Sequence, residues 1–407
     1  VVALQGEQFR FANGREPFIE TMSSYFPRQR DALARYFDLV SRVAGASSLH
    51  SLKYAESDAA INTEFQLRAI NDVLDELFDD ELLKRVLVGN LPLYAAEQDK
   101  TPFSTHAFIM DFYNQSAARV VGGSDSIATS LKNTILRYGG TVKTRQKVTK
   151  IVCDEAKATG VVVNDDCFMA ADAVVSAIHP MRTLELLDTK LIRPAFRRRI
   201  HAMPQTVGGF SVYLHFKDDA VPYLNYNYYG YQYESPWDCE KYTEESWPKG
   251  FLYMHFCPDD DTQYASTGVI LSYMQMSDVE KWRGTSVGKR GKAYEEFKKA
   301  KAEKLLSVLE MHFPGIRSKI QTYYTSTPLT YLDYTGTEGG SMYGNAKDIN
   351  LGSACRVPQR TKVPNVYLTG QNINSHGMLG VLVGAIVTCS ELLSAKTIYE
   401  QIKEANK

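Results

Sequence analysis

The segment Asn365–Cys389 constrains the fold of this 407-residue chain more than any other part of the sequence. Its sequence, NVYLTGQNINSHGMLGVLVGAIVTC, predicts a short apolar strand, a glycine-containing polar turn and a helix of small residues. Glycine lets a backbone leave a strand sharply and approach another group closely. A helix start offers unpaired N–H groups and a positive dipole end. We therefore expect an anion site here that binds a cofactor pyrophosphate, although a strand–helix unit with a purely structural role stays open.

This segment resembles the C-terminal flavin-binding motif of the phytoene desaturase superfamily. More narrowly, it is similar to the retinol saturase and carotenoid isomerase branch, which carries a stretch of the form LTGQNxNxHGxLG. The matching residues are Leu368–Asn372, Asn374, His376–Gly377 and Leu379–Gly380. Wider flavoprotein relatives have Gly-Asp at the turn, where this chain has Gly370-Gln371. A glutamine side chain can still form hydrogen bonds but carries no charge.

The resemblance implies a noncovalently bound FAD, with a hydride moving between its N5 atom and a carbon of an apolar substrate. It implies cofactor-binding residues at Gly370, Gln371, Gly377, Met378, Leu379 and Gly380. Gln371 would hold the ribityl or phosphate groups, and the helix start would stabilise negative charge on the reduced flavin. His376 is the candidate catalytic residue, as a proton donor or a substrate-orienting group. A helix-capping or supporting histidine is the equal alternative.

A second informative stretch covers residues 122–180. It predicts a Gly-Gly turn with Ser124 as N-cap, a helix over 125–138, and strands over 141–144, 147–153, 159–163, 167–170 and 173–177. The stretch is similar to the middle part of flavin amine oxidase and phytoene desaturase proteins. The resemblance implies adenine contacts at the backbone of Val148 and a return of the chain to the cofactor at Ser176. Taken alone, the pattern is a helix and a β-meander.

The remaining sequence predicts a second domain. Residues 1–12 read as two short strands, and helices are expected over 27–43, 60–89 and 106–115. Strands over 208–216, 223–233, 250–257 and 268–276 precede a charged helix over 292–312. The predicted fold class is α/β, with a Rossmann-like FAD/NAD(P)-binding domain (116–180 and 336–407). A second α+β substrate domain on an antiparallel sheet would comprise 1–115, as a helical cap, and 181–335.

Aromatic residues suggest where a substrate binds. Tyrosines occupy positions 223, 226, 228, 229, 231 and 233. Tyrosine favours half-buried sheet surfaces, so strand structure alone explains this cluster. An aromatic wall for a hydrophobic or planar substrate is the alternative. Tyr343, in the segment that leads back to the flavin domain of the similar family, is a further substrate or cofactor candidate, or else a core residue.

Composition limits the possible partners. A net charge of −1 gives no overall field for nucleic acid or an anionic membrane. The six cysteines are scattered without a CxxC pair, which indicates neither a zinc site nor a disulfide framework and suits a reducing compartment. We expect no metal, no nucleic-acid partner, a hydrophobic small-molecule substrate and a cytoplasmic location with peripheral membrane contact as an option. The oligomeric state is not indicated.

One feature of the similar family is missing from the sequence. That superfamily normally opens with a βαβ unit bearing GxGxxG, which binds the dinucleotide pyrophosphate, and this chain has no such motif. We expect about 90 residues upstream, from the size of such a unit and the strands after it. This chain alone is then expected to bind FAD poorly or not at all. A natural loss of the flavin is the alternative.

Three functions remain open on these grounds. The first is a FAD-dependent oxidoreductase that saturates, desaturates or isomerises a polyene or isoprenoid-like substrate. The second is an amine oxidase, which would usually show an aromatic pair at the flavin and often a cysteine for covalent attachment. The third is a non-catalytic lipid-binding remnant. The intact stretch 370–380 favours the first. NAD(P) is an optional electron source, because no separate nicotinamide motif is visible.

Overall fold

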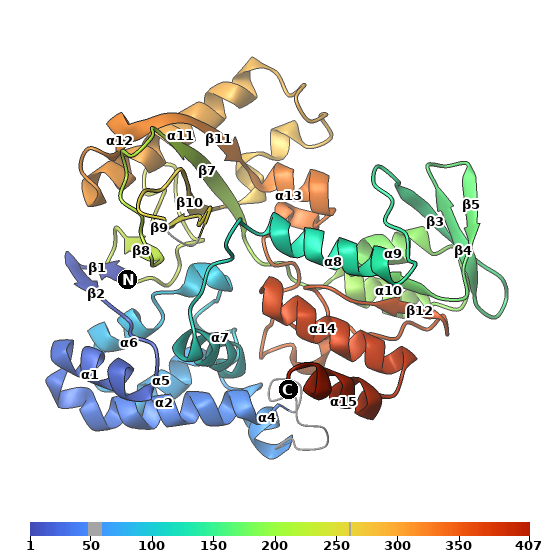
Figure 1. The fold of residues 1–407 in the computed structure, drawn as a ribbon, viewed down its shortest axis with the longest axis horizontal. Helices are drawn as coiled ribbons and strands as arrows, with labels where there is room; N and C mark the ends of the chain where they lie inside the picture. Colours follow the sequence, from blue (N-terminus) through green and yellow to red (C-terminus); the bar gives the residue numbers. More distant parts are fainter. Residues whose placement is uncertain (48–58, 260–261) are drawn as a thin grey trace.

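A computed structural model describes residues 1–47, 59–259 and 262–407. Figure 1 shows three neighbouring regions. A large sheet lies at the upper left, a layer of N-terminal helices (blue) lies below it, and the C-terminal helices (red) lie with smaller sheets at the right. Segments far apart in the sequence therefore meet where the three regions adjoin.

The large sheet has seven strands and is mostly antiparallel, as predicted; the exception is the parallel pair β1–β8. In spatial order the strands are β11 (Ile320–Ser326), β7 (Gly208–Phe216), β10 (Thr267–Met274), β9 (Gly250–His255), β8 (Tyr228–Tyr231), β1 (Val2–Leu4) and β2 (Glu7–Phe9). The prediction for 208–216 is confirmed, whereas the strand predicted over 223–233 is much shorter. β11 was not predicted.

The two faces of this sheet are buried against different helices, because side chains alternate along a strand. One face packs on the N-terminal helices and the other on α11 (Lys292–His312), whose limits match the prediction. Facing the N-terminal helices are Tyr229, Tyr231, Leu252 and Tyr273; facing α11 are Tyr228, Phe251, Tyr253 and Ile270. Burial on both faces explains why the central strands are apolar almost throughout.

The N-terminal helices form the cap. They are α1 (Arg15–Tyr25), α2 (Arg30–Gly45), α4 (Ala59–Phe65), α5 (Ile70–Leu77), α6 (Glu81–Leu87) and α7 (Phe103–Gln115). The single helix predicted over 60–89 is wrong, since three shorter helices occupy that range. One break has a clear cause: the Asp80 side chain accepts a hydrogen bond from Leu83 N at 2.9 Å and so caps a new helix.

The third region holds two smaller sheets. β3 (Val148–Cys153), β4 (Ala158–Val163) and β5 (Cys167–Ala170) form an antiparallel meander, while β6 (Val174–Ser176) pairs in parallel with β12 (Val366–Leu368). The surrounding helices are α8 (Asp125–Arg137), α9 (Pro180–Leu186), α10 (Pro194–His201), α14 (Gly377–Leu392) and α15 (Ala395–Ala405). Two short helices, α12 (Ile316–Lys319) and α13 (Pro328–Thr335), flank β11. The parallel pair and the separate large sheet confirm the predicted fold class.

Two predictions around α8 are wrong. Ser124 has helical backbone angles and does not cap α8; instead the Ser126 hydroxyl donates to Gly123 O at 2.7 Å. Residues 141–144, all of them described, form no strand. They follow a glycine stop, at which Gly139 has a φ of +79° and Gly140 N donates to Ile135 O at 2.9 Å.

The surface of the third region carries exposed apolar side chains. Every residue of α8 is at least partly exposed, and Leu131 and Ile135 are about half exposed. Val175 of β6 and Leu382 of α14 are also about half exposed. Within the described ranges, none of the helices is both long enough and apolar enough to cross a bilayer.

Buried neutral histidines make the fold sensitive to acid. His106 of α7 is fully buried, with its ring nitrogens 2.7 Å and 2.8 Å from the hydroxyls of Tyr36 and Tyr94. Burial lowers the pKa of His106 from 6.5 to about 3. Between these two pKa values the unfolded chain binds more protons than the folded one, so stability is complete above pH 6.5 and falls as the pH falls.

We expect His106→Gln to remove this share of the acid sensitivity. The free energy of unfolding of the wild type should fall by about 2 kcal/mol more than that of the variant between about pH 7 and pH 5. Denaturant unfolding at both pH values measures the difference. His215→Gln, at an exposed histidine of β7, is the matched control and should behave like the wild type. An equal loss in His106→Gln and wild type would contradict the expectation.

Candidate functional site

The predicted cofactor segment folds as a parallel strand, a tight turn and a helix. Thr369 N donates to Ser176 O at 2.9 Å and continues the pairing of β12 with β6. Gly370 then turns the chain with a φ of +91°, and a Cβ at this position would lie 3.1 Å from Ala177 O. The Thr388 hydroxyl donates to Leu368 O at 3.0 Å and holds α14 against the strand. Only glycine satisfies both the φ and the close approach at position 370.

Glycines also seat the start of α14 on the turn. A Cβ at Gly380 would lie 2.7 Å from the carbonyl carbon of Ser375, so a larger residue would push the helix off the loop. Gly377, the first residue of α14, has a φ of +76°. Both Gly377 and Met378 are exposed, and Leu379 is half-buried. The first N–H groups of the helix are therefore accessible, as an anion site requires.

The segment that returns from the large sheet interlocks with this turn. Asn372 Oδ1 accepts a hydrogen bond from Asn345 N at 2.9 Å. Gly344, with a φ of +73°, packs so tightly that a Cβ would lie 1.9 Å from the same oxygen. Gln371 Nε2 donates weakly to Met342 O at 3.5 Å. The turn and the return segment thus form one unit, with Gln371 at their junction.

His376 connects the start of α14 to the cap. Its Nε2 lies 3.3 Å from Leu93 O, and its ring stacks on Tyr343 with centroids 4.4 Å apart and planes at 32°. The Tyr343 hydroxyl donates to Pro92 O at 2.7 Å. Although part of His376 is accessible, the protein atoms around the ring desolvate it and lower its pKa to about 4. The structure thus brings the catalytic and substrate candidates together, and their roles stay a prediction.

The polar groups at the turn fit a flavin. Thr369 Oγ1, Asn374 Nδ2 and Asn345 Nδ2 are buried and have no hydrogen-bonding partner within the described part of the chain. Buried polar atoms usually have a partner, so three orphans around one turn indicate a polar ligand. The accessible helix start supplies further donors. Hydroxyl, amide and backbone N–H groups suit the carbonyl, ribityl and phosphate groups of a flavin.

Two other predicted cofactor residues are placed differently. The Ser176 hydroxyl lies 2.7 Å from that of Thr183 in α9, so only the Ser176 backbone faces the turn. Val148 begins β3 and pairs with Val163, in the meander rather than in the β6–β12 pair. Its predicted contact with adenine remains an expectation from the resemblance.

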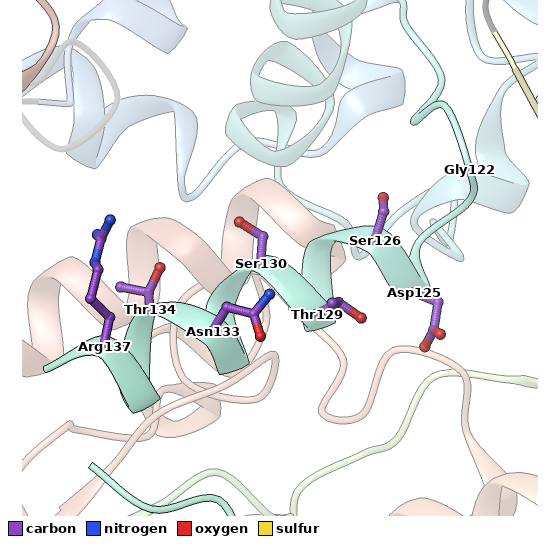
Figure 2. A pocket seen from close by; sticks show the side chains of 8 residues that line it. All are labelled: Gly122, Asp125, Ser126, Thr129, Ser130, Asn133, Thr134 and Arg137. Carbon is purple, nitrogen blue, oxygen red and sulfur yellow. The ribbon is translucent and has the colours of Figure 1, made fainter. Parts of the chain in front are cut away.

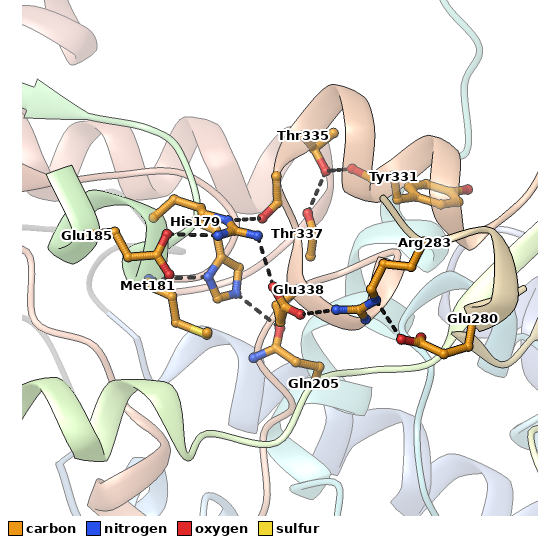
Figure 3. A network of polar contacts seen from close by, with 12 residues as sticks. His179, Met181, Glu185, Gln205, Glu280, Arg283, Tyr331, Thr335, Thr337 and Glu338 are labelled. Atoms are coloured by element: carbon orange, nitrogen blue, oxygen red, sulfur yellow. Dashed lines mark hydrogen bonds and ion pairs between the residues drawn. The ribbon is translucent and has the colours of Figure 1, made fainter. Parts of the chain in front are cut away.

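A polar network behind the turn was missed by the sequence analysis (Figure 3). Glu338 accepts from Arg182 of α9 at 3.0 Å and from Arg283 at 2.9 Å, and so links the third region to the large-sheet region. His179 Nε2 lies 3.0 Å from Gln205 Oε1, and Gln205 Nε2 donates to Asn345 at 2.7 Å. These residues lie far apart in the sequence and share no motif, so a single sequence carried no signal for the network.

The contacts of His179 give it a structural role. Its Nδ1 accepts a hydrogen bond from Met181 N at the start of α9, at 3.3 Å. Its Nε2 therefore carries the proton that is donated to Gln205. Burial lowers the pKa of His179 below its usual value. A neutral His179 thus caps α9 and supports the return segment through Gln205.

An open groove follows one face of α8 (Figure 2). It has a volume of about 660 Å³, begins at Gly122 and is lined by hydroxyl and amide side chains together with Asp125 and Arg137. Such a lining suits a polar ligand better than an apolar one. Across the described ranges, no group of three or more side chains is placed to hold a metal ion.

Comparisons with known proteins define the class of this site. The family model for flavin containing amine oxidoreductases matches residues 6–392, so the chain belongs to that family and is a flavin-dependent oxidoreductase with a Rossmann-like domain and a second domain. The flavin implied by this family fits the orphaned polar groups at the 369–376 turn.

Individual proteins within the comparisons show which relatives the chain is similar to. The chain is 26% identical to rat all-trans-retinol 13,14-reductase over 98% of its own length and 71% of the relative's. It is 20% identical to prolycopene isomerase 2 from an Oncidium hybrid cultivar, over 94% of its length and 67% of the relative's. Among solved structures, putrescine oxidase bound to putrescine superposes with a TM-score of 0.56 at 16% identity, covering 99% of this chain and 80% of that one. The last likeness supports the fold alone.

Gly344→Ala tests whether the interlock builds the cofactor site. The new methyl group would collide with Asn372 Oδ1. In the protein at its full natural length we therefore expect a loss of bound flavin and a free energy of unfolding lower by about 1–3 kcal/mol than in the control. The control is Gly288→Ala, because Gly288 has the same φ of +73° but no atom within 4 Å of the place where the methyl group would lie. Visible flavin absorbance and denaturant unfolding measure the two effects. Equal behaviour of both variants would refute the interlock.

Proposed function

We propose that this protein is a FAD-dependent oxidoreductase that acts on an apolar polyene or isoprenoid-like substrate by saturation, desaturation or isomerisation. The sequence relatives support the substrate class, since their names specify retinol and prolycopene. FAD, rather than another flavin, is inferred from the motif at 368–380. The orphaned polar groups at the turn and the accessible start of α14 support binding of this cofactor there.

The observation that carries the proposal is that the tyrosine hydroxyls beside the site are bonded to the backbone of the cap. The hydroxyls of Tyr231, Tyr273 and Tyr343 all donate to backbone carbonyl oxygens of the cap, at 2.7, 3.2 and 2.7 Å. Burial raises the pKa of all three phenols, so they stay neutral. The rings therefore offer apolar faces rather than free hydroxyls, and apolar ring faces suit a conjugated hydrocarbon.

The space among these rings is nearly filled. A cavity of about 10 Å³ remains between Pro92, Tyr231 and Tyr273, which is room for about one water. A bound polyene must therefore displace side chains or separate the cap from the sheet.

Within this proposal, the residues of the turn would bind and orient the cofactor. Flavin, once bound, supplies the hydride chemistry. Thr369, Asn345 and Asn374 would satisfy its polar groups, and the N–H groups of Gly377 and Met378 would stabilise negative charge at its edge. The aromatic side chains would exclude water and align the substrate.

The amine-oxidase alternative is less well supported. The family's name includes amines, but family membership covers many reactions, and the two sequence relatives are named for polyenes. The proposal includes NAD(P)H as the electron source. It also includes contact with a membrane surface that delivers the substrate.

The deciding experiment uses the protein at its full natural length, loaded with FAD. The reduced flavin is mixed anaerobically with an all-trans polyene alcohol or a carotenoid, and the oxidised flavin with the same compounds and with an aliphatic diamine. Reoxidation by the polyene indicates saturation, bleaching by it indicates desaturation, and a changed isomer without net flavin change indicates isomerisation. Bleaching by the diamine alone, or no flavin bound at all, would overturn the proposal. NADH and NADPH are then compared as reductants.

Membrane contact has its own measurement. The protein should co-sediment with neutral and anionic vesicles. A polyene supplied in vesicles should be converted faster than the same polyene supplied in detergent micelles. Recovery of all the protein in the supernatant with both vesicle types would remove this part of the proposal and leave the polyene chemistry unaffected.

A further inference from the structure

One short segment of the cap accepts hydrogen bonds from several distant ring side chains. This segment, residues 89–93, is called the cap turn below. The Tyr231 hydroxyl of β8 donates to Gly89 O at 2.7 Å, and the Tyr273 hydroxyl of β10 donates to Leu91 O at 3.2 Å. Both bonds are buried. They fix the cap turn to the face of the large sheet.

The other end of the cap turn is fixed to the cofactor segment. The Tyr343 hydroxyl donates to Pro92 O at 2.7 Å, and His376 Nε2 lies 3.3 Å from Leu93 O. Three consecutive carbonyl oxygens of the cap thus accept side-chain bonds from three separate elements. The sheet, the return segment and the start of α14 all take their position from one turn.

This geometry determines the protonation of His376. A carbonyl oxygen can only accept, so the hydrogen bond to Leu93 O requires a proton on Nε2. Desolvation keeps the ring neutral at pH 7, and the positive charge of Lys347 lowers its pKa further. Nδ1 then carries a lone pair. A neutral imidazole whose single N–H is bound to the backbone is a poor proton donor.

Tyr343 is fixed with equal firmness. Its hydroxyl is tied to the cap turn, its backbone N donates to the Thr206 hydroxyl at 3.2 Å, and its ring stacks on His376. Burial raises the pKa of the Tyr343 phenol, so this group also keeps its proton. Neither member of the pair is set up to exchange a proton at neutral pH.

We propose that Tyr343 and His376 are a positioning pair, held by the cap turn. The pair sets where the start of α14 lies relative to the rings of Tyr231 and Tyr273. The pair acts through geometry and not as an acid or base. This inference rests on the proposed function only where turnover is measured. Its spectroscopic tests need no substrate. It revises the role of proton donor considered for His376 from the sequence.

The decisive comparison is His376→Gln with His376→Ala. A glutamine Nε2 can reach the position of the histidine Nε2 and donate to Leu93 O, but it has no titratable proton. We expect the glutamine variant to keep turnover within about fivefold of the wild type and the alanine variant to lose at least about tenfold, with a shifted flavin absorbance. His215→Ala, at an exposed histidine, is the matched control for removal of a histidine.

Nuclear magnetic resonance of ¹⁵N-histidine-labelled protein tests the protonation directly. The His376 signal, assigned from the glutamine variant, should show a neutral ring protonated on Nε2 from pH 7 down to about pH 5. A signal protonated on Nδ1, or one that titrates near the ordinary value of 6.5, would overturn the inference. The inference would also be overturned if His376→Gln were as inactive as His376→Ala and its pH profile of kcat had lost one limb.

Tyr343→Phe separates the two bonds of the pair. It keeps the ring stacked on His376 but removes the bond to Pro92 O, so we expect a raised KM with a smaller change in kcat and a shifted His376 signal. Unchanged KM and unchanged signal would contradict the pair. If no polyene is turned over by the wild type, the proposed function fails, while the histidine signal and the flavin absorbance still decide the positioning inference.

Discussion

The hydrogen bond from Asn345 N to Asn372 Oδ1 is the constraint on which the site depends. It joins the segment that returns from the large sheet to the turn that precedes α14. Gly344 lies too close to the same oxygen for any side chain, so the return segment can approach the Asn372 side chain this closely only at a glycine. With this contact made, the orphaned groups of Thr369, Asn345 and Asn374 gather around one turn. The proposed cofactor site is therefore a product of tertiary packing between distant segments.

The cap is tied to this constraint through its backbone. Side-chain donors from the sheet, the return segment and α14 all reach carbonyl oxygens of residues 89–93. Backbone carbonyls are always available as acceptors, so such contacts leave the cap sequence free to vary while the geometry is kept. The same bonds occupy the tyrosine hydroxyls and make the space beside the turn apolar. The position of α14 and the apolar character of the proposed substrate region thus have one physical cause.

Local patterns predicted what local physics determines. The helix over 292–312 and the strand over 208–216 were found with their observed limits, because periodicity and flanking glycines define them. The long helix over 60–89 failed because Asp80 caps a new helix inside an apolar periodic pattern. At the site, the turn at Gly370 was predicted, but its partners Asn345 and Leu93 were not. Contacts across such sequence distances leave no trace in the spacing of residues along one chain.

The chemistry of His376 follows from its neighbours rather than from its residue type. A histidine before a helix in a flavin motif suggests an acid, since its ordinary pKa lies near neutrality. Here the carbonyl acceptor fixes one tautomer. Desolvation by the surrounding protein atoms lowers the pKa of His376 to about 4. In flavin chemistry a hydride moves at N5 and the protein supplies mainly position and electrostatics. A rigid, neutral ring stacked on Tyr343 meets that need because it holds α14 in place without adding a charge beside an apolar substrate.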